Sequence, residues 1–260
     1  MRAAEYEFFR PSFLALAHRG GAHYGPNRHR ENSRHAFEQA AALGYRYFET
    51  DVHATADGVL LAFHDDKLDR VTDRRGRIAE LPYAEVAEAR IHGIDPVPRL
   101  DELLTAFPDT RFNIDAKSAT AVDLLADTIA EHGAADRVCV SSFGVRRLHR
   151  LRRRAGRRVA SSASAVGVAV NRFLPWLTRV LNTPAPALQI PVRHLFGSRE
   201  VTLLTPELVR TVHRAGKQVH VWTVDDPATI EWLLDRGVDG IFTDRVDTLK
   251  DVLTSHGRWT

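Results

Sequence analysis

Three short motifs in the first quarter of the chain carry side chains that could act on a phosphate ester. They are His18-Arg19-Gly20, Glu49-Thr50-Asp51 and His64-Asp65. Two histidines can serve as general base and general acid near neutral pH, and the planar guanidinium of an arginine matches a phosphate bidentately. The motifs therefore predict phosphodiester chemistry, provided that the fold brings them together.

The two acids of the second motif are candidates for a metal site. Glu49 and Asp51 are one residue apart in a strand-like run, so their side chains point to the same face. Neighbouring carboxylates resist joint ionisation unless a cation lies between them, and such hard oxygen ligands suit Mg²⁺ or Ca²⁺. Asp115, after the strand-like run Arg111 to Ile114, could supply a third ligand. The alternative is a set of ordinary acids at an exposed strand edge.

Strand-like and helix-like segments alternate along the whole chain, which predicts a parallel sheet. Roughly eight strands in 260 residues favour one closed (β/α)8 barrel, a single domain over residues 1–260, rather than a doubly wound open sheet. Asp57-Gly58 also predicts a hairpin turn between two of the strands. In such a barrel, functional residues lie at the carboxyl ends of the strands. The expected strands are Phe13–Ala17, Tyr45–Val52, Val59–Phe63, Arg111–Ile114, Val138–Ser141, Val159–Ser161, Ala187–Ile190, Val219–Thr223 and Gly240–Thr243.

Composition limits the function classes. The net charge is +3, and the chain has one cysteine, Cys139, so an internal disulfide is excluded. The first ten residues lack a secretory pattern, and no apolar run is long enough to span a bilayer, so we expect a cytoplasmic protein. An arginine-rich helix at about Val145 to Ala155 is either a solvated face or a patch for anionic lipid. It lacks interleaved aromatic residues, which argues against nucleic acid as a partner.

A second segment leaves membrane contact open. Val166 to Leu181 includes Phe173, Leu174 and Trp176 together with Arg172. One interpretation is a barrel helix packed on strands, and the other is an interfacial segment that dips into a membrane to reach lysophospholipids.

Several motifs in order resemble the glycerophosphodiester phosphodiesterase family. The resemblance covers about residues 14 to 250. The motifs that carry it are His18-Arg19-Gly20, Glu31-Asn32-Ser33, Glu49-Thr50-Asp51, Asp57-Gly58, His64-Asp65, Leu68-Asp69-Arg70-Val71-Thr72, Asn113-Ile114-Asp115-Ala116-Lys117, Ser141-Ser142-Phe143, Val221-Trp222-Thr223 and Gly240-Ile241-Phe242-Thr243-Asp244.

The resemblance implies a (β/α)8 barrel with a small insertion after the second strand, at about residues 65–95. It implies a divalent cation on Glu49, Asp51 and Asp115, and His18 with His64 as the acid–base pair. It further implies that Arg19 and Lys117 bind the phosphate and that Trp222 lines the pocket on the glycerol side. In similar enzymes a glycerol hydroxyl of the substrate attacks phosphorus, and water opens the cyclic phosphate to give glycerol 3-phosphate and an alcohol.

Two departures from the family pattern leave alternatives. The family usually has Glu where this chain has Asp115, and the loop Gly21 to Arg30 is longer and more basic than usual. That loop is either a surface loop whose sequence has diverged without a functional role or a lid that favours anionic head groups. The expected activity is hydrolysis of small glycerophosphodiesters. The alternatives are a lysophospholipase D-type hydrolase and a non-catalytic protein that binds a phosphate ligand.

Overall fold

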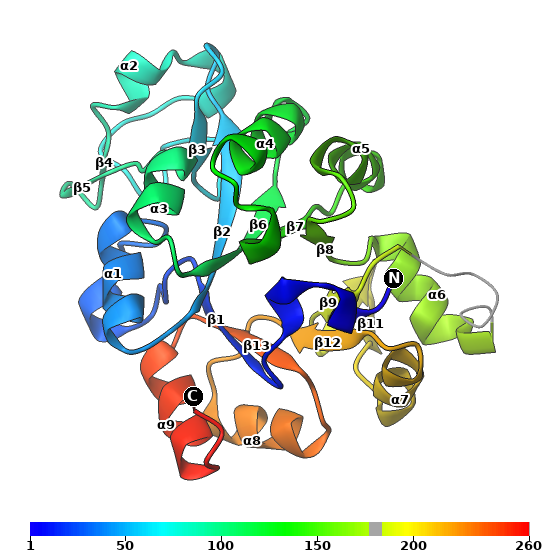
Figure 1. Ribbon diagram of the computed structural model, residues 1–260. Coiled ribbons are helices and arrows are strands. Elements are labelled where there is room, and N and C mark those ends of the chain that lie inside the picture. The colour runs from blue at the N-terminus through cyan, green and yellow to red at the C-terminus, as the bar shows by residue number, and fades with distance from the viewer. Residues whose placement is uncertain (177–183, 260) are drawn as a thin grey trace.

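Eight parallel strands form a barrel that is nearly closed (Figure 1). A computed structural model describes residues 1–176 and 184–259. The strands follow the order β8-β7-β6-β2-β1-β13-β12-β9, and a parallel bridge from Ser162 to Ala187 links the two outer strands. The predicted barrel is therefore confirmed. Its strands are β1 (Leu14–His18), β2 (Tyr47–Ala54), β6 (Arg111–Ala116), β7 (Val138–Ser141), β8 (Ala160–Ser161), β9 (Ala187–Ile190), β12 (Gln218–Val221) and β13 (Gly240–Thr243).

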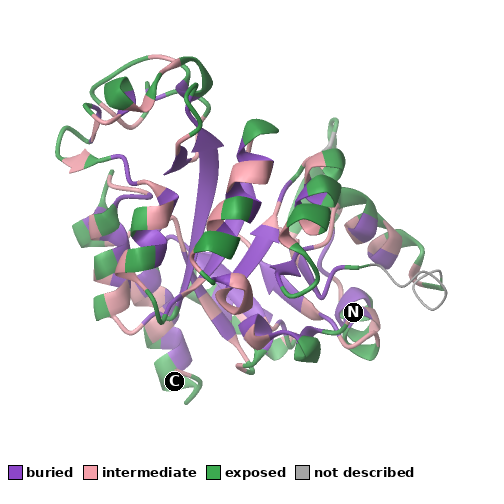
Figure 2. Ribbon diagram, turned by 45° about the horizontal axis from the view of Figure 1, so that its top comes forward, coloured by how far each residue is buried: buried purple, intermediate pink, exposed green. Residues whose placement is uncertain are grey.

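Amphipathic helices surround the barrel, with buried faces toward the strands and exposed faces outward (Figure 2). Side-chain caps begin several of them: Ser33 accepts from the amide of Ala36, and Thr205 accepts from that of Leu208. The helices are α1 (Arg34–Ala42), α3 (Leu100–Ala106), α4 (Thr120–Glu131), α5 (Val145–Ala155), α6 (Ala165–Phe173), α7 (Pro206–Arg214), α8 (Pro227–Asp235) and α9 (Val246–Ser255).

Successive side chains of each strand point alternately outward, into the apolar core beneath the helices, and inward, into the polar mouth of the barrel. Phe48 of β2 and Phe112 of β6 point outward and pack edge to face, with ring centroids 5.6 Å apart. Their strand neighbours Glu49, Asp51 and Asp115 therefore point inward. The same alternation that builds the core thus places three acids inside the barrel.

The predicted hairpin forms, and it leaves the barrel. β3 (Leu60–Ala62) pairs antiparallel with the end of β2, with Val52 opposite Ala62. Of the expected strands, 59–63 is therefore not a barrel strand, and His64 reaches the mouth on the returning arm of this hairpin. A small insertion follows, with its own apolar cluster around Leu61, Phe63 and Ile78. It contains η4 (Ile78–Glu80), α2 (Tyr83–Val86), β4 (Arg90–Ile91) and β5 (Asp95–Pro96).

The N-terminal segment closes the end of the barrel opposite the mouth. Phe8 and Phe9, in the 3₁₀ helix η2 (Glu7–Phe9), are buried against interior residues of the strands. The hydroxyl of Tyr47 donates to the carbonyl of Phe8 at 2.6 Å. This role is not apparent from the sequence, because two phenylalanines beside charged residues form no periodic pattern. The other short elements are η1 (Ala3–Glu5), η3 (Gly25–Asn27), η5 (Ala135–Arg137) and the antiparallel hairpin β10 (Arg193–Phe196) with β11 (Arg199–Thr202).

Both segments considered for lipid contact lie on helices. In the arginine-rich α5, Arg150 and Arg154 form ion pairs with Asp123 of α4, which favours a solvated, neutralised face. α6 covers the first part of the apolar segment, while residues 177–181 of that prediction lie outside the described residues. None of the helices in the described part of the chain has the length and apolar character needed to cross a bilayer.

Candidate active site

A cavity of about 330 Å³ lies at the carboxyl ends of the barrel strands. Such a position is where barrel enzymes place their reacting groups. The cavity brings together every site residue predicted from the sequence: His18, Arg19, Glu49, Asp51, His64, Asp115, Lys117 and Trp222.

The three predicted metal ligands are buried acids on two adjacent strands. Asp51 of β2 and Asp115 of β6 are register neighbours, and Glu49 lies two residues earlier on β2. Their exposed fractions are 2%, 5% and 5%, in that order. Nζ of Lys117 lies 2.8 Å from Asp51 Oδ1 and 2.8 Å from Asp115 Oδ2, so an ammonium group supplies positive charge between these two carboxylates. Burial lowers the pKa of Lys117, but the two carboxylates outweigh it and the pKa lies above its ordinary value.

Glu49 lies in surroundings that disfavour its charged form. Burial, reinforced by the charge of Asp51, raises its pKa to about 7. Its Oε2 lies 3.7 Å from Nε2 of His18 and accepts from the backbone amide of Arg19 at 3.3 Å. A cation near Glu49 and Asp51 would favour the charged form of both.

The donor set fits a divalent cation. Oδ2 of Asp51 is buried and accepts no hydrogen bond from the described residues, although Arg19 Nε lies 3.4 Å away. A buried carboxylate oxygen without a donor is costly unless a cation satisfies it. Three carboxylates offer the hard oxygens that Mg²⁺ and Ca²⁺ prefer.

A second acidic group lies beside the first. Ligand atoms of His23, Asp225 and Asp244 lie within 4.8 Å of one another. These acids already have donors: Asp225 Oδ1 accepts from the hydroxyl of Thr243 and from the amide of Asp244, and Asp244 holds His18. Oδ2 of Asp51, in contrast, is a buried oxygen without a hydrogen-bond donor among residues 1–176 and 184–259, which favours Glu49, Asp51 and Asp115 as the candidate metal ligands.

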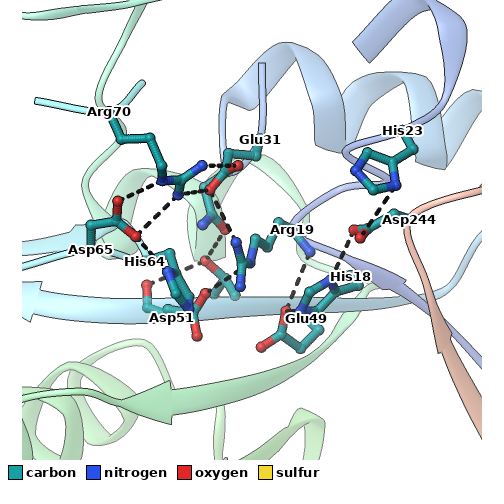
Figure 3. A network of polar contacts seen from close by, with 12 residues as sticks. His18, Arg19, His23, Glu31, Glu49, Asp51, His64, Asp65, Arg70 and Asp244 are labelled. Atoms are coloured by element: carbon teal, nitrogen blue, oxygen red, sulfur yellow. Dashed lines mark hydrogen bonds and ion pairs between the residues drawn. The ribbon is translucent and has the colours of Figure 1, made fainter. Parts of the chain in front are cut away.

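His18 is oriented by a carboxylate from the far end of the chain. Its Nδ1 lies 2.8 Å from Oδ1 of Asp244, which follows β13, the strand paired with β1 (Figure 3). Burial lowers the pKa of His18, but Glu49 and Asp244 outweigh it, so the pKa lies above its ordinary value. With Nδ1 bonded to Asp244, Nε2 is left for the cavity. In the sequence Asp244 is only the last residue of a motif, and its role is not apparent there because its partner is 226 residues away.

His64 is held in the same way by its neighbour in sequence. Nδ1 of His64 lies 2.6 Å from Oδ1 of Asp65. The two imidazoles thus each have a carboxylate at Nδ1 and both line the cavity. This paired arrangement is suited to one proton leaving an attacking oxygen and another reaching a leaving oxygen.

Arg19 is fixed by an unusual backbone turn at the end of β1. Its φ is 50°, in the left-handed region, and its amide donates to the carbonyl of Glu49 at 3.0 Å. Gly20 and Gly21 continue the turn with φ of 82° and 87°. A Cβ at Gly20 would lie 2.8 Å from Cβ of Ala36, so only glycine lets the loop approach α1 this closely. The chain therefore turns sharply after β1, with a strained non-glycine residue at the start of the turn.

The opposite wall of the cavity is apolar. It comes from α6, β9 and the ends of the later strands, and Trp222 packs edge to face on Phe143 with ring centroids 5.8 Å apart. We call this surface the apolar wall, and it includes Val168, Phe173, Ile190, Leu203, Trp222 and Phe242.

Known proteins resemble this chain over most of its length. The model of the "Glycerophosphoryl diester phosphodiesterase family" matches residues 18–248. The "Probable glycerophosphodiester phosphodiesterase 2" of Mycobacterium tuberculosis is 43% identical over 95% of this chain and 92% of its own length. The "Glycerophosphodiester phosphodiesterase" of Caldanaerobacter subterraneus is 29% identical over 94% and 99%.

Solved structures share the fold. A glycerophosphodiester phosphodiesterase from Agrobacterium tumefaciens superposes with a TM-score of 0.75 at 23% identity, covering 93% of this chain and 99% of that one. An Oleispira antarctica phosphodiesterase, solved in complex with its product sn-glycerol-3-phosphate, has a TM-score of 0.75 at 22% identity, over 93% and 96%. With the family model matching most of its length, the chain belongs to the glycerophosphoryl diester phosphodiesterase family.

Proposed function

We propose that the protein hydrolyses glycerophosphodiesters to glycerol 3-phosphate and an alcohol in a metal-dependent reaction. The observation that carries the proposal is the pair of imidazoles, His18 and His64, each with a carboxylate at Nδ1 and both facing one cavity beside buried acids. Family membership supports the reaction class. The product-bound Oleispira antarctica structure supports glycerol 3-phosphate as the product.

The residues divide the work by charge and position. Arg19 and Lys117 bind phosphate oxygens, and Trp222 packs on the glycerol side. One imidazole takes the proton of the glycerol hydroxyl as its oxygen bonds to phosphorus, while the other protonates the leaving alcohol oxygen as the phosphorus–oxygen bond breaks. Water then opens the cyclic phosphate, with the two imidazoles exchanging roles.

Glu49, Asp51 and Asp115 would hold the divalent cation, Mg²⁺ or Ca²⁺. When bound, it neutralises phosphate charge and polarises the phosphoryl group. The shorter Asp115, paired with Lys117, is compatible with this role because it is the register neighbour of Asp51. Chelation should abolish turnover, and Mg²⁺ or Ca²⁺ should restore it. Full activity after exhaustive chelation would contradict the metal dependence.

Substitution of the histidines tests the acid–base roles. We expect His18→Ala and His64→Ala each to abolish release of glycerol 3-phosphate from glycerophosphocholine while metal binding, measured by calorimetry, persists. His149→Ala is the matched control, because His149 is exposed on α5 outside the barrel. Full activity in either site variant would overturn the assignment.

A lysophospholipase D-type activity is the second candidate, favoured by the apolar wall. Exposed apolar side chains belong to the cavity lining or follow lining residues in the sequence: Phe143 is 65% exposed, Trp176 63% and Leu195 64%. The relative named "Lysophospholipase D GDPD1" in Mus musculus is 26% identical over 92% of this chain. An acyl chain could lie along this wall while the exposed side chains contact an anionic lipid surface.

Paired substrates discriminate the two candidates. Turnover of lysophosphatidylcholine at a rate comparable to glycerophosphocholine, with sedimentation on anionic vesicles, would support the lipid substrate. Trp176→Ser should then reduce vesicle binding, whereas Ile94→Ser, an equally exposed apolar site on the insertion, should not. No lipid turnover and no vesicle binding would remove this candidate.

We further propose a single-domain protein in a reducing, cytoplasmic location, where the one buried thiol of Cys139 would stay reduced. A non-catalytic phosphate-binding role is disfavoured, because binding alone has no need for two carboxylate-oriented imidazoles. Calorimetry that detects ligand binding with metal supplied, but no product over hours, would reinstate it.

A further inference from the structure

We propose that Arg70 is a positioning residue that holds His64 and Arg19 in one arrangement by bridging Asp65 and Glu31. The inference rests on the proposed function for the roles of His64 and Arg19, but the bridge itself is visible in the contacts (Figure 3). Arg70 lies in the insertion, outside the cavity. In the sequence it is only one residue of the motif Leu68-Asp69-Arg70-Val71-Thr72.

One guanidinium makes both halves of the bridge. Nη1 and Nη2 of Arg70 donate to the two oxygens of Glu31 at 2.9 and 2.7 Å. Nε donates to Asp65 Oδ2 at 2.6 Å, and Nη2 also reaches Asp65 Oδ1 at 3.1 Å. Only the planar fork of an arginine can pair bidentately with two carboxylates at once.

Each bridged carboxylate holds a group of the proposed reaction. Asp65 accepts from Nδ1 of His64, and Glu31 accepts from Nη1 of Arg19 at 3.2 Å. The contacts therefore run without a break from His64 through Asp65, Arg70 and Glu31 to Arg19. This series joins an imidazole on the returning hairpin to a guanidinium on the β1 loop. The backbone of each segment is bonded to β2, through the amides of Phe63 and Arg19, so the bridge adds a constraint between the two side chains.

The charge balance keeps both carboxylates ionised. Burial raises the pKa of Asp65, but the hydrogen bonds from Arg70 and His64 outweigh it and lower the pKa to about 2. Burial likewise raises the pKa of Glu31, and Arg70 and Arg19 outweigh it, so the pKa lies below its ordinary value. An ionised Asp65 accepts the hydrogen on Nδ1 of His64, so the other ring nitrogen, Nε2, is left for the cavity.

A second ion pair joins the same two segments and provides the control. Arg30, in the loop after β1, pairs with Asp95 of the insertion at 2.5 Å and 2.6 Å. It touches neither His64 nor Arg19 among the described contacts. If Arg70 merely fastened the insertion to the barrel, loss of Arg30 would have the same effect as loss of Arg70.

The experiment compares the single variants Arg70→Gln, Arg70→Lys, Glu31→Gln and Arg30→Gln with the double variant Glu31→Gln/Arg70→Gln. We expect Arg70→Gln to lower kcat for glycerophosphocholine about 100-fold, because misplacement of reacting groups by about 1 Å costs that much. Arg70→Lys should recover only part of the loss, since a lysine cannot bridge both acids. Arg30→Gln should stay within about threefold of the wild type. The double variant should be no slower than the slower single variant, because both substitutions break one series of contacts.

A nitrogen NMR measurement of the His64 ring tests the positioning without relying on turnover. The wild type should show the tautomer with the proton on Nδ1, and Arg70→Gln should show a mixture, while Arg30→Gln keeps the wild-type signal. An unchanged tautomer in Arg70→Gln, or equal losses of kcat in Arg70→Gln and Arg30→Gln, would overturn the inference. A wild type with no hydrolytic activity but the expected tautomer change would instead refute the proposed function and leave the positioning supported.

Discussion

The substitution Asp244→Asn is expected to disturb the orientation of the His18 ring and to leave ligand binding nearly unchanged. Asp244 Oδ1 lies 2.8 Å from Nδ1 of His18, and their side chains are 12% and 15% exposed, so the pair is largely shielded from water. A carboxylate in this position enforces the proton on Nδ1. An asparagine can present its amide nitrogen instead, which would move the imidazole proton to Nε2 and disable the ring as a base.

The size of the effect follows from the bond that is lost. A hydrogen bond to a charged group contributes roughly 1.5–3 kcal/mol. If this difference appears in the transition state, at about 1.4 kcal/mol for each tenfold change in rate, kcat should fall about 10- to 150-fold. Binding of glycerol 3-phosphate should change little, because Asp244 holds the imidazole and not the phosphate.

The assay is release of glycerol 3-phosphate from glycerophosphocholine at saturating substrate, with product affinity measured separately by calorimetry. Asp247→Asn is the control, since Asp247 forms an ion pair with Arg245 at 3.0 Å on the outside of α9. A kcat for Asp244→Asn within threefold of the wild type would refute the reasoning. So would a loss of product affinity equal to the loss of kcat.

Three further perturbations test the charges and the packing around the site. Lys117→Met removes the ammonium between Asp51 and Asp115, so in chelator the free energy of unfolding should fall by about 3 kcal/mol and the unfolding temperature should fall with it. Added Mg²⁺ should raise the unfolding temperature of this variant more than that of the wild type. Phe48→Ala empties a fully buried site that packs on the rings of Phe37, Phe107 and Phe112, and urea unfolding should show a loss of about 3–5 kcal/mol. His220 is buried, and burial lowers its pKa from 6.5 to about 3. Its contribution to the free energy of unfolding is therefore complete above pH 6.5 and decreases as the pH falls toward 3. The upper bound of this loss is about 5 kcal/mol, and His220→Gln should flatten the acid limb of the stability curve measured by urea unfolding.

Local patterns predicted the parts of the site that lie on single strands. Glu49 and Asp51 share a face because side chains alternate, and the Asp57-Gly58 turn was readable from two residues. The alternation of strand-like and helix-like segments was sufficient to predict the barrel fold. Its shortest strand, β8, has two residues, Ala160 and Ser161, and was predicted as Val159–Ser161.

Long-range contacts were beyond the reach of the sequence. Nothing local indicates that Asp244 holds His18 or that Arg70 pairs with Glu31, because the partners are 226 and 39 residues apart. The position of the strand before His64 outside the barrel was also hidden, although the Asp57-Gly58 turn indicated that this strand returns antiparallel. A strand that returns antiparallel along β2 has the same apolar pattern as a barrel strand, and only the short turn between them distinguishes the two.

The two histidines show why the insertion belongs to the site rather than beside it. His18 is carried by a barrel strand, so its position is fixed by the sheet and needs one carboxylate, Asp244, to set its ring. His64 is carried by a hairpin that leaves the barrel. Its backbone is tied to β2 where the amide of Phe63 donates to the carbonyl of Asp51, but its ring is held by Asp65, whose own partner lies in the insertion. Arg70 is that partner, and it links Asp65 to Glu31, whereas Arg30 joins the same two segments without touching His64 or Arg19. A change within the insertion that preserves its apolar cluster but breaks the Arg70 bridge should therefore impair catalysis more than stability.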